Sequence, residues 1–123
     1  MGVGPIRRAG EHLDAVVLDG RIWAIGGRWR SGNVGTVEVY DPATDAWTSA
    51  PELPTPRSGL AAAVVDGRVH VVGGEALDSS RTFEAHEVYD PALERWERWE
   101  EMIPGRHGLA AAGADGSLYV IGG

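Results

Sequence analysis

One segment of this chain occurs nearly three times. Residues 57–74, RSGLAAAVVDGRVHVVGG, return 49 positions later as residues 106–123, and eleven of the eighteen positions are identical. A third copy, residues 14–27, lies 47 positions before the middle one and lacks only the Arg-x-Gly opening. A period of this length is typical of repeat architectures, in which each unit buries the apolar face of its neighbour. The sequence therefore predicts a repeat protein.

Composition limits the kinds of partner. The 123 residues carry a formal charge of -7, and they include no Cys. An acidic chain argues against nucleic acid or an anionic membrane as a partner, and we expect neither. The lack of Cys excludes disulfides, thiolate nucleophiles and Cys-based zinc sites. The first eight residues have no apolar core of signal-peptide length, which favours the cytoplasm but leaves the compartment open.

Each copy predicts two antiparallel strands. In the middle copy, the apolar run 60–65 is followed by Asp66-Gly67, a strong two-residue hairpin signal, and by a second run at 68–72. Both runs are apolar on both sides of the pleat, so we expect each sheet to be covered on both faces. Alanines fill the first strand at 61–63 and 110–112. Small side chains suit a place where several units converge, which puts the first strand nearest a central axis.

Two further strands follow in each unit. Residues 38–43, EVYDPA, correspond to residues 87–92, EVYDPA, and Trp47 corresponds to Trp96. Asp-Pro initiates a turn, so a third strand ends near Tyr40 or Tyr89 and a fourth carries the Trp. The glycine doublets that close the second strand permit positive φ and close approach, and we expect aromatic rings to use that space. The residues predicted to be structural are Gly26, Gly27, Tyr40, Trp47, Gly73, Gly74, Tyr89, Trp96, Gly122 and Gly123.

An apolar strand ending in Gly-Gly, then Tyr-Asp-Pro, then Trp after a short turn, resembles the kelch repeat. The resemblance covers about residues 12–123 and implies an all-β fold of four-stranded antiparallel propeller blades. It divides the chain into an N-terminal extension (1–11), blade 1 (12–50), blade 2 with its preceding loop (51–100) and the first two strands of blade 3 (101–123). Kelch-like propellers usually have about six blades, so we expect an incomplete ring. The remaining blades would come from a larger chain or from a homo-oligomer.

Strand direction predicts where a site could lie. The start of the first strand and the end of the second share one rim, and the Asp-Gly turns occupy the opposite rim. In kelch propellers that bind partners, the Arg before the first strand and the residue after Gly-Gly commonly line the pocket mouth. By this resemblance the predicted ligand-binding rim consists of Arg28, Arg57, Ser58, Arg106 and His107. Guanidinium groups favour a carboxylate-bearing protein segment or a small acidic ligand. The alternative is that these residues form local salt bridges or keep the rim soluble.

Other reactive side chains give no pattern for catalysis or metal binding. The four His residues lack metal-ligand spacing, and His70 occupies the position of Trp23 and Tyr119, which indicates packing. Ser58 has no identifiable base beside it. Glu38 and Glu87 recur in register, as structural residues do, and this argues against an acid and base pair. We predict no catalytic residue, no metal and no cofactor.

These observations favour a non-catalytic module that binds a protein or another ligand through an Arg-rich rim. Two alternatives stay open. One is a fragment of a propeller enzyme that acts on carbohydrate, similar to the sialic acid epimerase type. The other is a structural module that closes a ring by oligomerisation. Fold resemblance alone does not decide among them, because propellers serve all three purposes.

Overall fold

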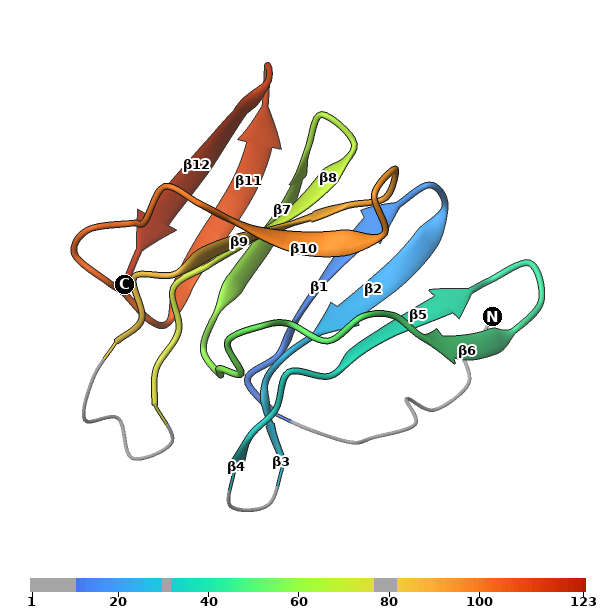
Figure 1. Cartoon of the computed structure of the whole chain (residues 1–123), viewed down its shortest axis with the longest axis horizontal. Coiled ribbons are helices and arrows are strands. Elements are labelled where there is room, and N and C mark those ends of the chain that lie inside the picture. The colour runs from blue at the N-terminus through green and yellow to red at the C-terminus, as the bar shows by residue number, and fades with distance from the viewer. Residues whose placement is uncertain (1–10, 30–31, 77–81) are drawn as a thin grey trace.

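The computed structural model describes residues 11–29, 32–76 and 82–123, which form antiparallel sheets (Figure 1). Only Glu11 of the predicted N-terminal extension falls within these residues. Within these ranges there is no helix that could cross a membrane. Blade 1 consists of β1 (Asp14–Leu18), β2 (Arg21–Ile25), β5 (Val37–Asp41) and β6 (Ala46–Ser49). Blade 2 consists of β7 (Ala61–Val65), β8 (Arg68–Val72), β9 (His86–Asp90) and β10 (Arg95–Trp99). A third unit has β11 (Leu109–Ala114) and β12 (Ser117–Gly122), and β3 (Arg28–Trp29) pairs with β4 (Gly32–Asn33).

Both four-stranded sheets are meanders, in which every strand pairs antiparallel with the next. The predicted all-β fold of four-stranded blades in an incomplete ring is therefore confirmed. Each first and second strand meet at an Asp-Gly turn, and at Asp66-Gly67 both residues have positive φ, 50° and 73°. This is the turn that matches the right-handed twist of the flanking strands.

The first strands of the three units lie side by side, with β7 between β1 and β11 (Figure 1). Ala61, Ala62 and Ala63 of β7 are all buried, at most 5% exposed. Their small side chains let the neighbouring sheets approach at the centre, as the sequence predicts. The third and fourth strands of each blade lie farther from these first strands (Figure 1). In the turn after β9, Leu93 is half exposed.

Successive units are joined by main-chain hydrogen bonds. The amide of Gly27 donates to the carbonyl oxygen of Arg57 over 2.8 Å, and the amide of Gly74 donates to that of Arg106 over 2.7 Å. The second glycine of each doublet thus binds the residue that leads into the next unit. The same joint is therefore made twice with the same atoms.

A second line of hydrogen bonds runs along the starts of the first strands. The amide of Gly59 donates to His12 over 2.9 Å, and the amide of Gly108 donates to Gly59 over 3.1 Å. These three residues share a left-handed backbone, with φ of 59°, 64° and 62° in chain order. His12 therefore takes the conformation of the two glycines, although the first unit lacks the Arg-x-Gly opening.

The space beside the glycine doublets is not filled as predicted. A Cβ atom on Gly73 would lie 2.6 Å from the carbonyl oxygen of Arg106 and 3.0 Å from Leu109, and one on Gly26 would meet Leu60. Main chain and leucines of the next unit occupy the space beside the first glycine of these two doublets, and residues of the same unit lie against the second glycine, instead of Tyr and Trp rings. The reason is the joint described above, which brings the next unit's backbone against the doublet.

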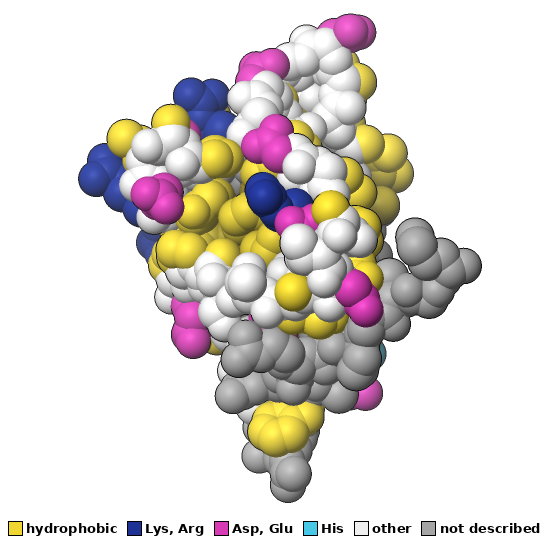
Figure 2. Space-filling view, turned by 90° about the vertical axis from the view of Figure 1, so that its right-hand side faces the viewer, with side chains coloured by type: hydrophobic (Ala, Val, Ile, Leu, Met, Phe, Trp, Pro, Cys, Tyr) yellow, Lys and Arg dark blue, Asp and Glu magenta, His cyan; other side chains and the backbone are white. Residues whose placement is uncertain are grey.

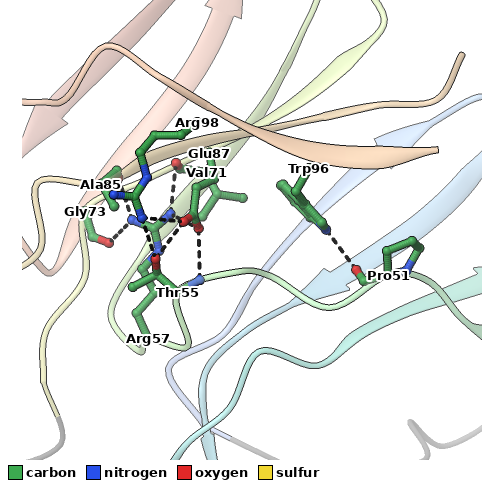
Figure 3. A network of polar contacts seen from close by, with 9 residues as sticks. All are labelled: Pro51, Thr55, Arg57, Val71, Gly73, Ala85, Glu87, Trp96 and Arg98. Atoms are coloured by element: carbon green, nitrogen blue, oxygen red, sulfur yellow. Dashed lines mark hydrogen bonds and ion pairs between the residues drawn. The ribbon is translucent and has the colours of Figure 1, made fainter. Parts of the chain in front are cut away.

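The aromatic side chains pack between the outer parts of the blades. Tyr89 lies between Trp96 of its own blade, at a centroid distance of 5.5 Å, and Trp23 of blade 1, at 5.0 Å. The indole of Trp96 donates a hydrogen bond of 2.8 Å to the carbonyl oxygen of Pro51 (Figure 3). These contacts fasten blade 2 to blade 1 away from the inner strands.

Candidate functional site

The main chain of the predicted rim residues lies just before the first strand or just after the second strand of a unit, at the end opposite the Asp-Gly turns. Antiparallel bridges join Glu11 to Arg28 and Ser58 to Glu75, so the same two positions pair in blades 1 and 2. His107 follows in the third unit. Three units therefore contribute to one edge, but the side chains lie at very different depths.

Arg28 and Glu11 form an ion pair at the surface of the first unit. The guanidinium Nε donates to Glu11 Oε1 over 2.9 Å, and the two side chains are 22% and 67% exposed. The other end of the guanidinium, Nη2, lies 3.4 Å from Nε2 of His12. Arg28 is thus held close to the sheet, and its acidic partner remains in solvent.

His107 and Glu75 form the corresponding pair between the second and third units. The distance from His107 Nδ1 to Glu75 Oε2 is 3.0 Å, and the side chains are 49% and 9% exposed. Here the basic partner is the accessible one. The rim therefore presents one open carboxylate, at Glu11, and one open imidazole, at His107.

Ser58 lies beneath these pairs and is fully buried. Its hydroxyl donates a 2.9 Å hydrogen bond to Oδ1 of Asn33, and the Asn33 side-chain amide donates to the carbonyl oxygen of Glu75 over 2.9 Å. Ser58 therefore connects the β3–β4 hairpin to the segment after Gly74. This placement corrects the expectation that Ser58 faces a ligand.

Arg57 is also buried, with no exposed surface, and this corrects its predicted position on the open rim. Its guanidinium donates to the carbonyl oxygens of Gly73, Ala85 and Val71 at 2.9, 2.6 and 3.3 Å (Figure 3). It also donates to Glu87 Oε1 at 3.0 Å. The side chain points inward, where the ends of β8 and β9 offer it three carbonyl oxygens and a carboxylate.

The Glu87 carboxylate connects the linker between the blades to β9 and β10. It accepts a 2.6 Å hydrogen bond from the hydroxyl of Thr55 and lies 3.5 Å from Nη2 of Arg98 (Figure 3). Burial lowers the pKa of Arg57 to about 10, and the attraction of Glu87 opposes that shift. Arg57 therefore stays charged at neutral pH, and the contact is an ion pair inside the blade.

Arg106 stands at the same repeat position as Arg57 but has few contacts. It is partly exposed, and within the described part of the chain its side chain donates one long hydrogen bond, 3.4 Å, to the carbonyl oxygen of Gly122. This bond corresponds to the one from Arg57 to Gly73. Burial and bonding of the two arginines differ because Arg57 lies against β9, whereas β12 has only β11 beside it among the described strands.

Sequence reasoning missed Thr55, Asn33 and Glu11 and assigned Glu87 only a structural position. One signal could have indicated the Arg57–Glu87 pair. Glu87 sits in a strand whose neighbours are apolar, and a carboxylate in such a strand needs a cation nearby. Thr55 and Asn33 carry no comparable signal, since polar loop residues are common.

Two histidines of blade 2, on β8 and β9, pack together. His70 Nδ1 lies 2.9 Å from His86 Nε2, and His86 Nδ1 lies 3.1 Å from the carbonyl oxygen of Glu100. A carbonyl only accepts, so His86 carries its proton on Nδ1 and accepts at Nε2 from the Nδ1–H of His70. The rings of His70 and Trp99 also meet in a T-shaped arrangement, at a centroid distance of 5.2 Å. Among the described residues, no group of three or more His, Asp or Glu could hold a metal ion.

Acid is expected to destabilise blade 2 through this pair. Burial, then His86 and Arg68, lower the pKa of His70 to about 4, and burial lowers that of His86. Because the folded-state pKa of each lies below its unfolded value, stability is full above about pH 6.5 and falls as the pH decreases toward 4. Between pH 7.5 and pH 5 we expect a loss on the order of 2 kcal/mol from His70. Urea unfolding at both pH values measures it, and a His70→Phe variant should lose clearly less; an equal loss in both proteins contradicts the assignment.

Four-stranded antiparallel meanders placed side by side around their first strands define the blades of a β-propeller. The Kelch motif matches residues 12–54 of the chain. The chain is 38% identical over 72 residues to human Kelch-like protein 33 and 34% identical over 82 residues to alpha-scruin of Limulus polyphemus. It is also 38% identical over 72 residues to the mouse influenza virus NS1A-binding protein homolog. The chain is a partial member of the kelch-repeat family.

These alignments take in 58%, 66% and 58% of the chain, in the same order. They cover only 14%, 9% and 11% of the relatives' own lengths. The chain thus spans a small part of the proteins it matches. The similarity therefore identifies the repeat, and it does not carry over the activity of a whole relative.

Proposed function

We propose that this partial kelch propeller is a non-catalytic protein-binding module, and that its contact surface is the rim formed by Glu11, Arg28, Glu75 and His107. The observation that carries the proposal is the pairing of acidic with basic side chains from three consecutive units along one edge. Such an edge offers a partner several polar contacts in a fixed spacing. The hydrogen bonds of Asn33 with Ser58 and with the carbonyl oxygen of Glu75 support that spacing.

The chemistry of the rim favours a segment that carries a carboxylate. Glu11 is 67% exposed, so an incoming carboxylate can displace it from Arg28 at little cost. His107 is accessible and becomes a second cation when protonated. One of the relatives is named for binding another protein, the NS1A-binding protein homolog of mouse, and this supports a protein as the partner class.

A displayed library of random peptides tests this function. We expect the full chain to select peptides rich in Asp or Glu, and we expect an Arg28→Ala/His107→Ala variant to bind the selected peptides at least about tenfold more weakly. Arg21→Ala is the matched control, because Arg21 pairs with Asp41 at 3.5 Å beside the opposite rim. Selection of no peptide, or equal weakening by the control variant, would contradict the proposal.

A further inference from the structure

A cavity of about 410 Å³ lies between the outer strands of blade 1 and the turn that joins β9 to β10 in blade 2. Trp23 and Val39 of blade 1 and Tyr89 of blade 2 line its apolar part. Figure 2 shows this side of the molecule, where hydrophobic side chains form a hollow and charged side chains stand around it. Both walls belong to four-stranded sheets, and the volume is in the range of ligand-binding sites.

The hydroxyl of Tyr89 lacks a partner beside this cavity. Tyr89 is only 5% exposed, yet its hydroxyl makes no hydrogen bond with another residue that the structure describes. In blade 1 the corresponding residue, Tyr40, donates a 2.5 Å hydrogen bond to Asp45. Buried polar groups are nearly always hydrogen-bonded, so the hydroxyl of Tyr89 needs a partner inside the cavity.

Glu94 stands at the position of Asp45, 49 residues later, and also lines the cavity. Its side chain is exposed, and within the described ranges its carboxylate forms neither a hydrogen bond nor an ion pair. Burial and then the negative charge of Glu94 raise the pKa of Tyr89, so that hydroxyl stays neutral at physiological pH. The cavity therefore offers a ligand one carboxylate and one neutral hydroxyl.

The charges around the cavity favour a cation. Its described lining includes one basic residue, Arg21, and two acidic residues, Asp41 and Glu94, so the net charge is -1. Arg21 Nε lies 3.5 Å from Asp41 Oδ2, and these two charges largely offset each other. The charge that is left is that of Glu94. The whole chain carries a formal charge of -7, which also attracts a basic partner.

The aromatic lining favours a guanidinium over an ammonium group. The rings of Trp23 and Tyr89 lie 5.0 Å apart at their centroids and are tilted by 48°. Both kinds of cation are attracted to aromatic rings, but a guanidinium is planar and more weakly hydrated, so it enters such a place at a lower cost. It also has five N–H donors, enough for the Glu94 carboxylate and the Tyr89 hydroxyl oxygen together.

We infer that this cavity binds an arginine side chain of a protein partner, with its guanidinium against the aromatic rings and hydrogen-bonded to Glu94 and Tyr89. The partner's main chain stays outside, beside the exposed Thr48 and Ser49 of the lining. Arg21 directly follows the turn between β1 and β2, so the site lies at the end opposite the rim that the proposed function uses. The two sites select opposite charges.

Peptides with one variable residue are the probes. The sequence is acetyl-Gly-Gly-X-Gly-Gly-amide, where X is arginine, lysine or citrulline, which has nearly the shape of arginine without its charge. NMR titration of the full chain at about 150 mM salt measures binding. We expect the arginine peptide to shift the amide signals of Trp23, Thr48 and Glu94. It should bind at least about tenfold more tightly than the citrulline peptide, and more tightly than the lysine peptide.

Variants of the chain assign the contacts. Glu94→Gln should weaken binding of the arginine peptide at least about fivefold, and Tyr89→Phe, which keeps the ring, should weaken it less. Arg21→Ala should strengthen binding, because it leaves the Asp41 carboxylate without its cation. The matched control is Asp115→Asn in the turn between β11 and β12, which removes the same charge and keeps a favourable turn dipeptide. Its binding should be unchanged.

Three results would overturn the inference. The first is binding of the lysine or the citrulline peptide as tight as that of the arginine peptide. The second is unchanged binding of the arginine peptide by Glu94→Gln. The third is equal weakening by Asp115→Asn, since binding would then follow the net charge of the chain. The Arg28→Ala/His107→Ala variant should bind the arginine peptide normally, so this inference and the proposed function can fail separately.

Discussion

Replacing Arg57 by Ala is expected to lower the free energy of unfolding by about 3–5 kcal/mol, because it leaves the Glu87 carboxylate buried without its main cation. Replacing Arg106 by Ala at the same repeat position should cost less than about 1 kcal/mol, since that side chain is partly exposed and makes one long bond. Urea unfolding of both variants measures the difference. Nearly equal losses would contradict the internal role of Arg57.

A double-mutant cycle separates the ion pair from the packing of the Arg57 side chain. Arg57→Met keeps most of the volume and removes the charge, and Glu87→Gln removes the opposite charge. Arg57→Met leaves the buried Glu87 carboxylate without this cation, and Glu87→Gln leaves the buried Arg57 guanidinium without its carboxylate. In the double variant neither residue is charged. We expect the double variant to lose less stability than the sum of the two singles, with a coupling of about 1–3 kcal/mol. Additive losses would mean that the contact is incidental.

The second large effect is expected at Gly73, where a methyl group would meet the carbonyl oxygen of Arg106 at 2.6 Å. Gly73→Ala should cost about 1–3 kcal/mol beyond backbone strain, because the joint between the second and third units must open. Gly67→Ala is the matched control: its φ of 73° is close to the 70° of Gly73, and nothing lies within 4 Å of the added atom. In that variant the free energy of unfolding should fall only by the strain of a left-handed alanine, about 1–2 kcal/mol.

Hydrogen exchange locates the Gly73 effect. Amides of β11 and β12 should exchange faster in Gly73→Ala, because the hydrogen bond from Gly74 to Arg106 holds these strands against blade 2. The same amides should be unchanged in Gly67→Ala. Faster exchange confined to β7 and β8 in both variants would show that the glycine matters only for its own hairpin.

The fold could be predicted from short-range patterns. Asp66-Gly67 between two apolar runs determines a hairpin, and the recurrence of Tyr40 and Trp47 as Tyr89 and Trp96 indicates two more strands. Each of these signals lies within a few residues, and residues that close in the sequence also contact one another in a hairpin or turn. The prediction that aromatic rings lie beside the glycine doublets was wrong. What lies there depends on how closely the next unit's backbone approaches, and no local pattern encodes that distance.

The site was predicted less well, and Arg57 shows why. An arginine ahead of an inner strand was assigned to the rim, because the arginine at this position commonly lines the pocket mouth in kelch propellers that bind partners. Its burial depends on three carbonyls and a carboxylate from residues 71–87, brought together only by the sheet. Arg28 and His107 do lie at the rim, each paired with a carboxylate, and their role in binding stays a prediction.

The joints from Gly27 to Arg57 and from Gly74 to Arg106 use peptide groups alone. The angle at which one sheet follows another therefore depends on main-chain geometry, and the tight space around Gly27 and Gly74 protects that geometry. A modular array built by copying residues 57–105 in tandem should keep a constant angular step. The exposed rim residues of each copy could then be altered independently, while the spacing and orientation of the copies stay the same.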